Sequence, residues 1–471
     1  MPFDEARWLS LERRPAETLR TALQRSLRQA IHSGALRPGV RLPSSRSLAD
    51  HLGISRGVVS DVYATLQAQG FLIGHSRAAP VVAALPSPQS APQQTPHAAP
   101  LAVRYDLSPA TPDVTLFPMR RWLTALQHVA RTSSTAVLDY RYPLGERALR
   151  EALADHLGRT RGAVADPDRI LITQGTAQAV DLIVRVLGAR GASRIAMEDP
   201  SLLRQHERVL ALGLTPVAQP VDGEGLKVVG LDADAVLVTP AHQFPTGAVL
   251  SAERRRELLG WARQRAQRWI IEDEYDAEFR YDREPVRCLQ GLDPGRVIEM
   301  GSVSKTLAPA LRLGWLVLPA SLVEDAVRVK RLLDDFSPAL DQLTLANFLR
   351  SGEYDRHVRR TRVVYRARRD RMLAALQRKL PELSVEGIAA GMHLLLRLPR
   401  GVDDRSLAAA AERRSLRVAP LSEFSIAPST NPALVIGYGR LHEGEIEPAI
   451  NLLTELIGRP MALTDSTGMA P

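Results

Sequence analysis

A proline-rich stretch divides the chain into two parts that must fold separately. Residues 86–100 hold five prolines and no Asp, Glu, Lys or Arg. Such a stretch cannot bury a core and should be extended and semi-rigid, although an ordered loop across one domain is the alternative. The length of 471 residues also suits two or three domains. We predict a small domain over residues 1–84, a linker over 85–103, a large domain over 104–460 and a tail over 461–471.

The small domain has the pattern of a helix-turn-helix. Apolar residues recur at helical spacing over residues 17–32. Ser44 or Ser45 is a suitable N-cap for a second helix, which Gly53 ends, and Ser55 caps a third. Two helices joined by a short turn after a longer first helix form a helix-turn-helix.

The small domain is also basic, which suits a nucleic-acid partner. Residues 1–84 carry 11 arginines, no lysine and 6 acids, or +5 of the net charge of +9. The β-rich runs 71–73 and 81–83 predict a two-stranded wing. Because the N-terminal end of the second helix of such a motif enters the major groove, DNA is the expected partner. A three-helix interaction domain with a solvated basic face is the alternative. The residues expected at the DNA are Arg46, Ser55, Arg56, Gly57 and Ser60.

The runs 34–49 and 52–56 resemble the winged helix-turn-helix of GntR-type bacterial regulators. The resemblance implies that Arg46 and the Ser-Arg pair at 55–56 contact DNA. The wing departs from the pattern, because a Gly-rich tip is replaced by His-Ser-Arg-Ala-Ala-Pro over residues 75–80. Arg77 is then the clear candidate for a contact from the wing.

The large domain alternates between helical patterns and short β-rich runs, which indicates an α/β fold with a mainly parallel sheet. In such folds ligands bind where the strands end. We expect strands at 170–173, 194–198, 235–239, 269–272, 297–301 and 314–318, and helices at 145–159, 177–188, 202–212 and 253–268.

Three of these strand ends carry polar signals. A glycine turn at 174–178 opens a helix, and its N–H groups would suit a phosphate. A turn-rich loop follows at 240–247. The acids and tyrosine of 272–276 follow a buried strand, where a carboxylate could pair with a pyridinium nitrogen. A solvated acidic loop is the alternative for 272–276.

Lys305 lies among small and apolar residues in the run 301–315. A lysine in such surroundings loses its proton easily, and the free amine can form a Schiff base with a carbonyl. Ser302, Ser304, Thr306 and Arg312 could meanwhile hold a phosphate. A Schiff-base lysine beside a phosphate cup is the chemistry of pyridoxal 5′-phosphate (PLP), although a surface lysine in a strand and loop is the alternative.

Taken in order, these motifs resemble the fold-type I aminotransferases over residues 104–458. Together with the small domain, the chain resembles the MocR/GabR family, in which a GntR-type winged helix is fused to an aminotransferase-like domain. The runs 111–118, 239–247, 278–281 and 357–362 match that family as well. The resemblance implies an α/β fold: a winged helix-turn-helix, then a PLP-dependent transferase-like domain with a mainly parallel central sheet and a smaller C-terminal subdomain.

The resemblance implies PLP as the cofactor and gives roles to the matching residues. Lys305, the catalytic residue, would form the internal aldimine, Asp273 would pair with the pyridine nitrogen and Tyr275 would reach the ring hydroxyl. In a dimer Tyr140 would reach the neighbouring subunit's phosphate, and Tyr142 is the alternative for that role. No metal site is implied. The phosphate would be held by Gly175, Thr176, Ser302 and Arg312.

Two positions depart from the aminotransferase pattern. Leu202 stands where an aromatic residue usually stacks on the cofactor ring, and leucine offers no stacking geometry. Val435 stands where an arginine usually clamps the substrate carboxylate, and Arg440 is the nearest arginine. Without a bidentate clamp an amino acid is poorly oriented, so at most weak or partial transaminase activity is expected.

We therefore predict a cytoplasmic transcription regulator that binds a double-stranded DNA operator and senses PLP, or a small amine or amino acid that reacts with it. The family resemblance implies a head-to-tail homodimer. The single cysteine, the lack of a secretory start and the lack of a long apolar run fit a soluble protein with no membrane partner. A working aminotransferase with an accessory DNA-binding domain is the alternative, and a regulator with a vestigial cofactor site is a third.

Overall fold

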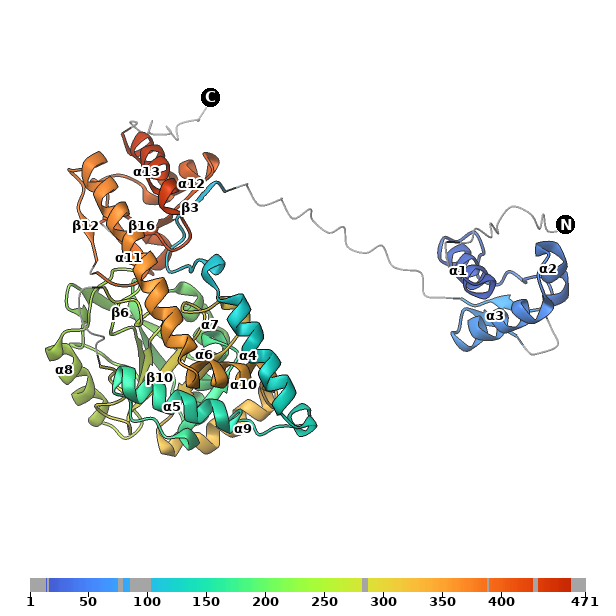
Figure 1. Cartoon of the computed structure of the whole chain (residues 1–471), viewed down its shortest axis with the longest axis horizontal. Helices are drawn as coiled ribbons and strands as arrows, with labels where there is room; N and C mark the ends of the chain where they lie inside the picture. The colour runs from blue at the N-terminus through green and yellow to red at the C-terminus, as the bar shows by residue number, and fades with distance from the viewer. Residues whose placement is uncertain are drawn as a thin grey trace, which may run out of the picture. The chain divides into compact units, whose positions relative to one another are not determined.

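The structure is a computed structural model in which the chain divides into two units, Met1–Ala99 and Pro100–Pro471. Each unit is described by itself (Figure 1). Apart from residue 103, the predicted linker lies outside the described residues, as does the tail. The residues described are 14, 17–74, 79–84, 103–281, 287–387, 389–426 and 431–458.

The described part of the first unit contains three helices, and a hydroxyl side chain caps the start of each. The cap residues Thr18, Ser44 and Ser55 accept hydrogen bonds from backbone N–H groups in the first turn, which otherwise have no partner within the helix. Gly53 ends the second helix in the left-handed conformation, with φ of 64°. The predicted helix-turn-helix is confirmed, with Ser44 rather than Ser45 as the cap. The helices are α1 (Leu19–His32), α2 (Ser45–Leu52) and α3 (Arg56–Ala68).

A two-stranded wing follows the helices, as predicted. Strand β1 (Leu72–Ile73) pairs antiparallel with β2 (Val81–Val82). The apolar stripes of α1 and α3 meet in a core that includes Leu23, Leu27 and Leu66, all fully buried. Burying each such side chain contributes roughly 1.5–3 kcal/mol.

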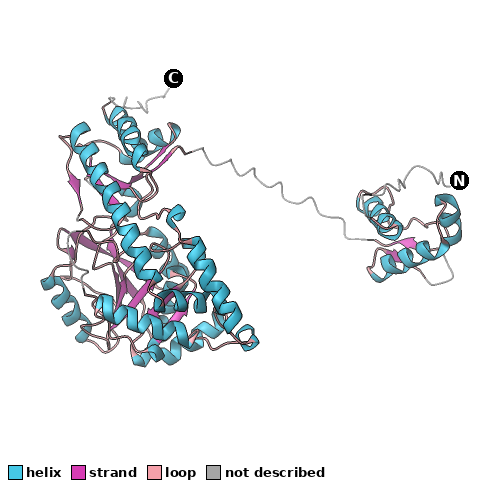
Figure 2. Ribbon diagram, viewed as in Figure 1, coloured by secondary structure: helices cyan, strands magenta, loops and turns pink. Residues whose placement is uncertain are grey.

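The second unit contains a sheet of eight strands surrounded by helices (Figure 2). The strands are β4 (Ile170–Thr173), β5 (Arg194–Asp199), β6 (Thr215–Asp222), β7 (Gly225–Leu226), β8 (Ala235–Val238), β9 (Trp269–Asp273), β10 (Val297–Ser302) and β11 (Gly314–Val317). Their order is β4-β11-β10-β9-β8-β5-β6-β7. Strands β10, β9, β8, β5 and β6 are parallel, whereas β11 is antiparallel to both β10 and β4. The prediction of an α/β fold with a mainly parallel sheet is confirmed.

The middle of this sheet is covered on both faces. Every residue of β4, β8, β9 and β10 is buried, which explains their nearly continuous apolar runs. The helices around the sheet are α4 (Met119–Thr132), α5 (Arg147–Arg161), α6 (Thr176–Ala189), α7 (Leu203–Ala211), α8 (Ala252–Arg263), α9 (Val323–Leu333) and α10 (Ala339–Arg350).

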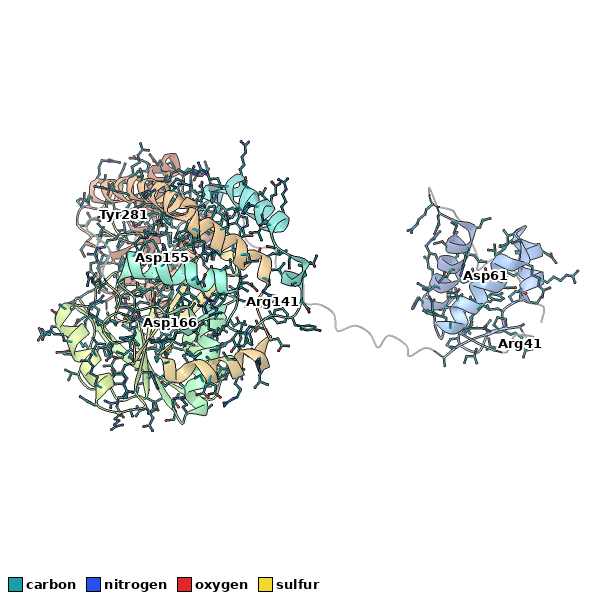
Figure 3. All side chains as sticks on the ribbon, turned by 60° about the horizontal axis from the view of Figure 1, so that its bottom comes forward. Arg41, Asp61, Arg141, Asp155, Asp166 and Tyr281 are labelled. Atoms are coloured by element: carbon teal, nitrogen blue, oxygen red, sulfur yellow. The ribbon has the colours of Figure 1, made fainter. Side chains whose placement is uncertain are left out.

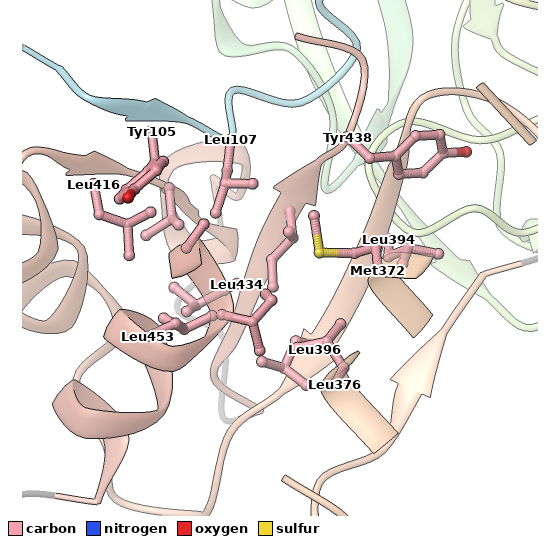
Figure 4. Close-up of a cluster of buried hydrophobic side chains, with 14 of the residues drawn as sticks. Tyr105, Leu107, Met372, Leu376, Leu394, Leu396, Leu416, Leu434, Tyr438 and Leu453 are labelled. Carbon is pink, nitrogen blue, oxygen red and sulfur yellow. The ribbon is translucent and has the colours of Figure 1, made fainter. Parts of the chain in front are cut away.

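A smaller subdomain completes the second unit. The long helix α11 (Glu353–Lys379) extends from the large sheet to the small subdomain (Figure 1). The sheet of this subdomain has the order β12-β13-β16-β15. Its strands are β12 (Val385–Glu386), β13 (His393–Arg397), β15 (Ala419–Pro420) and β16 (Ala433–Gly437). Leu394, Leu396 and Leu434 of this sheet pack against α11 and α13 (Figure 4). The remaining elements are β3 (Tyr105–Asp106), which pairs with β14 (Leu416–Arg417), and helices α12 (Asp404–Arg413) and α13 (Glu443–Ile457).

One helix ends earlier than its sequence pattern predicts. The pattern extends to Arg268, but α8 ends at Arg263. The reason is that the Arg268 guanidinium folds back, lies 4.7 Å over the Trp261 ring and donates to the Trp261 carbonyl at 3.2 Å. Arg268 therefore caps α8 rather than extending it. Separately, none of the helices among the described residues is long and apolar enough to cross a membrane.

Candidate functional site

Strands β9 and β10 bring two of the predicted cofactor residues to one edge of the sheet. The strands are parallel, with Asp273 opposite Met300, so both end at the same edge of the sheet, β10 two residues beyond β9. Asp273 is the last residue of β9, and Lys305 follows the end of β10 by three residues. The fold thus places the carboxyl group and the amine at neighbouring strand ends, where α/β proteins bind ligands.

Lys305 is half-buried, and its surroundings favour the free amine. Burial lowers the pKa of the Lys305 ammonium, and the charges of Asp276 and Asp273 oppose that shift without cancelling it. A lowered pKa increases the fraction of unprotonated amine at neutral pH, and the unprotonated amine is the nucleophile. The sequence holds only four lysines: Lys227, Lys305, Lys330 and Lys379.

Asp273 has a carboxyl oxygen that nothing in the described chain satisfies. The residue is 6% exposed. Its Oδ2 lies 3.5 Å from Nε2 of Gln205, and its Oδ1 has no hydrogen-bond partner among the described residues. Burial raises the pKa of Asp273 to about 7. A buried acceptor without a donor fits a cationic ring N–H, which would hold the carboxyl in its ionised form.

Three segments meet where the phosphate is expected. Gly175 is the N-cap of α6, with φ of 83°, and a Cβ added there would lie 3.2 Å from Nη1 of Arg312. Gly314 is even tighter, because its Cβ would lie 2.9 Å from the Gly175 Cα. Ser302 stands opposite Gly314 across β10 and β11. Thr176 is the first residue of α6, so the start of that helix, with its backbone N–H groups, lies close to the Arg312 guanidinium. A helix start beside a guanidinium suits an anion.

Tyr275 is brought to the same region but contacts a residue to which the sequence gave no role. The Tyr275 hydroxyl lies 3.0 Å from Nδ1 of His242, and Oδ2 of Asp276 lies 2.9 Å from that same nitrogen. His393 of β13 lies beside them, its ring tilted by 40° to that of His242 with the ring centres 5.0 Å apart. The available signal for His242 was its place in the loop after β8, another strand end. Gln205 and His393 gave no comparable signal.

Tyr140 and Tyr142 lie on the outside of the unit. The Tyr140 side chain is 86% exposed, and its ring packs edge-on against Phe336. Tyr142 is also exposed. The structure therefore leaves both tyrosines available to a second chain.

The two departures from the aminotransferase pattern differ in their surroundings. Leu202 is exposed and caps the start of α7 without a side-chain hydrogen bond. Val435 is fully buried inside β16, where it packs with Leu395 and Leu421. Arg440 is exposed, and its Nη1 lies 2.5 Å from Oδ2 of Asp106. A carboxylate clamp at Val435 would need an arginine inside an apolar cluster.

The residues predicted to contact DNA, as far as the structure describes them, all lie at the surface of the first unit. Arg46 of α2, Ser55, and Arg56, Gly57 and Ser60 of α3 are all exposed. The Arg56 Nε donates to the Ser45 hydroxyl at 3.4 Å, so Arg56 lies between the starts of α2 and α3. Asp61, on the next turn of α3, is labelled in Figure 3. Arg77 lies outside the described residues.

A buried acid on β10 is expected to make the stability of the fold depend on pH. Glu299 of β10 is almost fully buried, its Oε2 has no hydrogen-bond partner among the described residues, and burial raises its pKa from 4.5 to about 8. The folded chain therefore keeps a proton that the unfolded chain loses, and stability falls as pH rises from 4.5 towards 8.

We expect Glu299→Gln to remove this loss, since glutamine carries no titrating proton. The variant should match the wild type near pH 5 and be more stable by about 1–3 kcal/mol at pH 8. Thermal unfolding at a series of pH values measures the difference. Glu324→Gln, at an exposed position of α9, is the control. Equal pH dependence in the wild type and Glu299→Gln would refute the assignment.

Two family models match the chain. The model described as "Bacterial regulatory proteins, gntR family" matches residues 19–82, and the model "Aminotransferase class I and II" matches residues 109–447. The second match spans most of the second unit and includes Asp273, Lys305 and Arg312.

Curated relatives are similar along nearly the whole chain. The probable rhizopine catabolism regulatory protein MocR of Rhizobium meliloti is 31% identical over 94% of this chain and 95% of its own length. The HTH-type pyridoxine biosynthesis transcriptional regulator PdxR of Corynebacterium glutamicum is 31% identical over 92% of this chain and 96% of its own length.

Solved aminotransferases share the fold of the second unit. An archaeal alanine:glyoxylate aminotransferase superposes with a TM-score of 0.68 at 28% identity, covering 75% of this chain and 90% of that one. The kynurenine aminotransferase of Pyrococcus horikoshii superposes with a TM-score of 0.69 at 26% identity, covering 76% and 91%.

Proposed function

The chain belongs to the MocR-type GntR regulators, which join a GntR winged helix to an aminotransferase-like domain, and we propose that this regulator senses PLP at Lys305. The effector is PLP itself, or a small amine or amino acid that reacts with it. The single observation that carries the proposal is the buried Asp273 oxygen without a donor, one strand away from a lysine with a lowered pKa.

Each group of the cofactor has a residue suited to it. PLP supplies an aldehyde that condenses with an amine and a ring that withdraws electrons. Asp273 would hold the ring nitrogen, Tyr275 the ring oxygen and Lys305 the aldehyde carbon. Gly175, Thr176, Ser302 and Arg312 would bind the phosphate, through the α6 N–H groups, a hydroxyl and a guanidinium.

The names of the relatives agree with a small-molecule signal of this kind. PdxR of C. glutamicum is named as a pyridoxine biosynthesis regulator, which supports a vitamin B6 compound as the effector here. MocR of R. meliloti is named for rhizopine catabolism, which supports a small molecule as the signal here.

The alternative function is a working aminotransferase, favoured by the likeness to solved aminotransferases. The exposed Leu202 and the buried Val435 argue against it, because neither can stack on a ring or clamp a carboxylate. Single-turnover spectra with a panel of amino acids discriminate the two. Full conversion of the cofactor to its amine form, followed by turnover with a keto acid, would favour the enzyme.

We propose that the regulator works as a head-to-tail homodimer in the cytoplasm. The role proposed for Tyr140 is to bind the phosphate in the neighbouring subunit, and this role requires a second chain. The Tyr140 side chain is 86% exposed and is therefore available for that contact. Leu138 and Leu332 are exposed apolar residues that such a contact would cover.

Cofactor loading should change operator affinity. Saturating the protein with PLP should change its affinity for the DNA upstream of its own gene by at least about fivefold. Two protein chains should bind each DNA duplex. Fluorescence anisotropy at fixed salt measures the shift, and Lys305→Ala should show none. Equal affinity of the PLP-saturated and PLP-free wild type would refute PLP sensing, and one chain per duplex would refute the dimer.

A further inference from the structure

His242 and Asp276 form a buried pair directly behind Tyr275. Their side chains are 3% and 1% exposed, and the two polar atoms lie 2.9 Å apart. The Tyr275 hydroxyl lies 3.0 Å from the same His242 nitrogen, and the two rings stack at 24° with centres 6.2 Å apart. Two polar groups, the Tyr275 hydroxyl and the Asp276 carboxylate, therefore converge on one nitrogen atom, His242 Nδ1.

The position of the proton on His242 follows from its neighbours. An ionised carboxylate only accepts hydrogen bonds, so Nδ1 carries the proton and donates it to Asp276. The Tyr275 oxygen then lies beside an N–H group and accepts from it in a shared bond. Asp276 is also an acceptor within reach of the Tyr275 O–H, and because the Nδ1–H of His242 already occupies Asp276 Oδ2, the Tyr275 proton is left for a further acceptor. Burial, with the negative charge of Asp276, also raises the pKa of Tyr275 well above 10.0, so the phenol stays protonated.

We propose that His242, oriented by Asp276, is a positioning residue that makes Tyr275 a hydrogen-bond donor to the ring oxygen of PLP. This inference rests on the proposed function, because it requires PLP at Lys305. Without the N–H of His242, the Tyr275 hydroxyl is free to turn and donate elsewhere. The hydrogen bond from Tyr275 would stabilise the ionised form of the ring oxygen of PLP. The pair would thereby lower the pKa of the nitrogen that Lys305 contributes to the bond with PLP.

The small subdomain holds this pair in place. A Cβ at Gly391 would lie 2.2 Å from Cε1 of His242 and 2.7 Å from Oδ2 of Asp276, so the backbone packs directly on both side chains. The Gly391 carbonyl accepts from the Tyr281 hydroxyl at 2.6 Å and from the Tyr438 hydroxyl at 2.7 Å. Tyr281 is labelled in Figure 3. These hydrogen bonds hold the backbone at Gly391 in place, and that backbone in turn restrains the His242 side chain.

The same region has a donor set that could bind a metal ion, but its geometry favours the hydrogen bond. His242, Asp276 and His393 offer three ligand atoms within 4.8 Å of one another. Two atoms bound about 2.0–2.1 Å from one tetrahedral zinc ion lie about 3.3 Å apart. The 2.9 Å between Nδ1 and Oδ2 is instead the length of a charge-assisted hydrogen bond.

The test is a pH titration of the visible absorbance of full-length protein loaded with PLP. His242→Phe should raise the midpoint of the transition by about one pH unit, the equivalent of losing one hydrogen bond to the ring oxygen. His242→Asn, whose amide N–H can replace that of Nδ1, should restore the wild-type midpoint. His393→Phe is the matched control, a buried histidine nearby with no hydrogen bond to Tyr275, and should leave the midpoint unchanged.

A double variant separates positioning from a general disturbance of the site. Tyr275→Phe removes the donor itself, so adding His242→Phe to it should cause no further rise. His242→Leu removes the same N–H without changing a charge near Lys305, should raise the midpoint in the same direction, and serves if His242→Phe fails to fold. The other charged groups near Tyr275 and Lys305 are Asp273, Glu198 and Arg440, which the His242, His393 and Tyr275 variants leave intact.

The outcomes distinguish this inference from the proposed function. If the wild type shows no PLP absorbance that depends on Lys305, the proposed function fails and the inference fails with it. If the wild type shows that absorbance, an unchanged midpoint in His242→Phe, or an additive rise in the double variant, overturns only the role of His242. One equivalent of tightly bound divalent metal, lost in His242→Phe, would also overturn it in favour of a metal site.

Discussion

Lys305→Ala is expected to abolish the covalent attachment of PLP. The wild type should show a visible absorbance band distinct from that of free PLP, and borohydride reduction should fix the cofactor to the chain. In Lys305→Ala both signals should vanish, because alanine offers no amine. The residual affinity would come from Asp273 and the phosphate-binding residues alone. Absorbance spectra and mass spectrometry of the reduced protein measure the two effects.

The four lysines of the chain make this test sharp, because peptide mapping needs to separate only four candidates. Lys330 is the informative competitor. It is fully buried, and its pKa is also lowered by burial, although its Nζ donates to Asp334 at 2.8 Å and to Ser337 at 2.9 Å. Lys330→Gln should therefore keep the band. Reduction that labels Lys330, or a band that survives in Lys305→Ala, would refute the assignment of Lys305.

Arg56→Ala should weaken operator binding by at least about 30-fold. A well-placed arginine contributes about 1–3 kcal/mol at a base pair, and a dimer presents the residue twice. Arg56 is exposed at the start of α3, the end of a recognition helix that enters the major groove. Anisotropy titrations of the upstream DNA at several salt concentrations measure both the affinity and its salt dependence.

Arg20→Ala is the matched control for Arg56→Ala. Arg20 is also exposed, lies on α1 and donates to the Thr65 hydroxyl at 3.4 Å, away from the start of α3. The control should bind DNA nearly as well as the wild type. If both variants lose affinity equally, the effect is general charge; if neither does, α3 is not the reading helix.

The fold and half of the candidate site could be predicted from local patterns in the sequence. Asp273 ends a strand whose apolar run is visible in the sequence, and Gly175 and Lys305 follow the ends of two other such strands within three residues. Parallel strands bring these ends together. The α8 boundary could not be predicted in this way, because it depends on where the Arg268 side chain folds.

The rest of the site depends on contacts between distant segments. Asp276 is 34 residues from His242 along the chain, and Gly391 reaches both only because the small subdomain docks on the large one. No spacing rule connects these positions. The role of Gln205 likewise depends on the angle at which α7 leaves β5, which places its amide 3.5 Å from Asp273.

The crowding at Gly314 distinguishes residues that the fold requires from residues that only cofactor binding requires. A Cβ there would lie 2.9 Å from the Gly175 Cα and 3.0 Å from both the Gly301 carbonyl oxygen and the Thr173 hydroxyl. In a descendant that kept the fold but no longer bound the cofactor, Lys305 and Asp273 could be substituted freely. Gly314 could not be substituted, because any side chain there would push the strands apart. A retained glycine at this position would then indicate only that the fold is kept, whereas a retained lysine at 305 would indicate that the cofactor chemistry is kept.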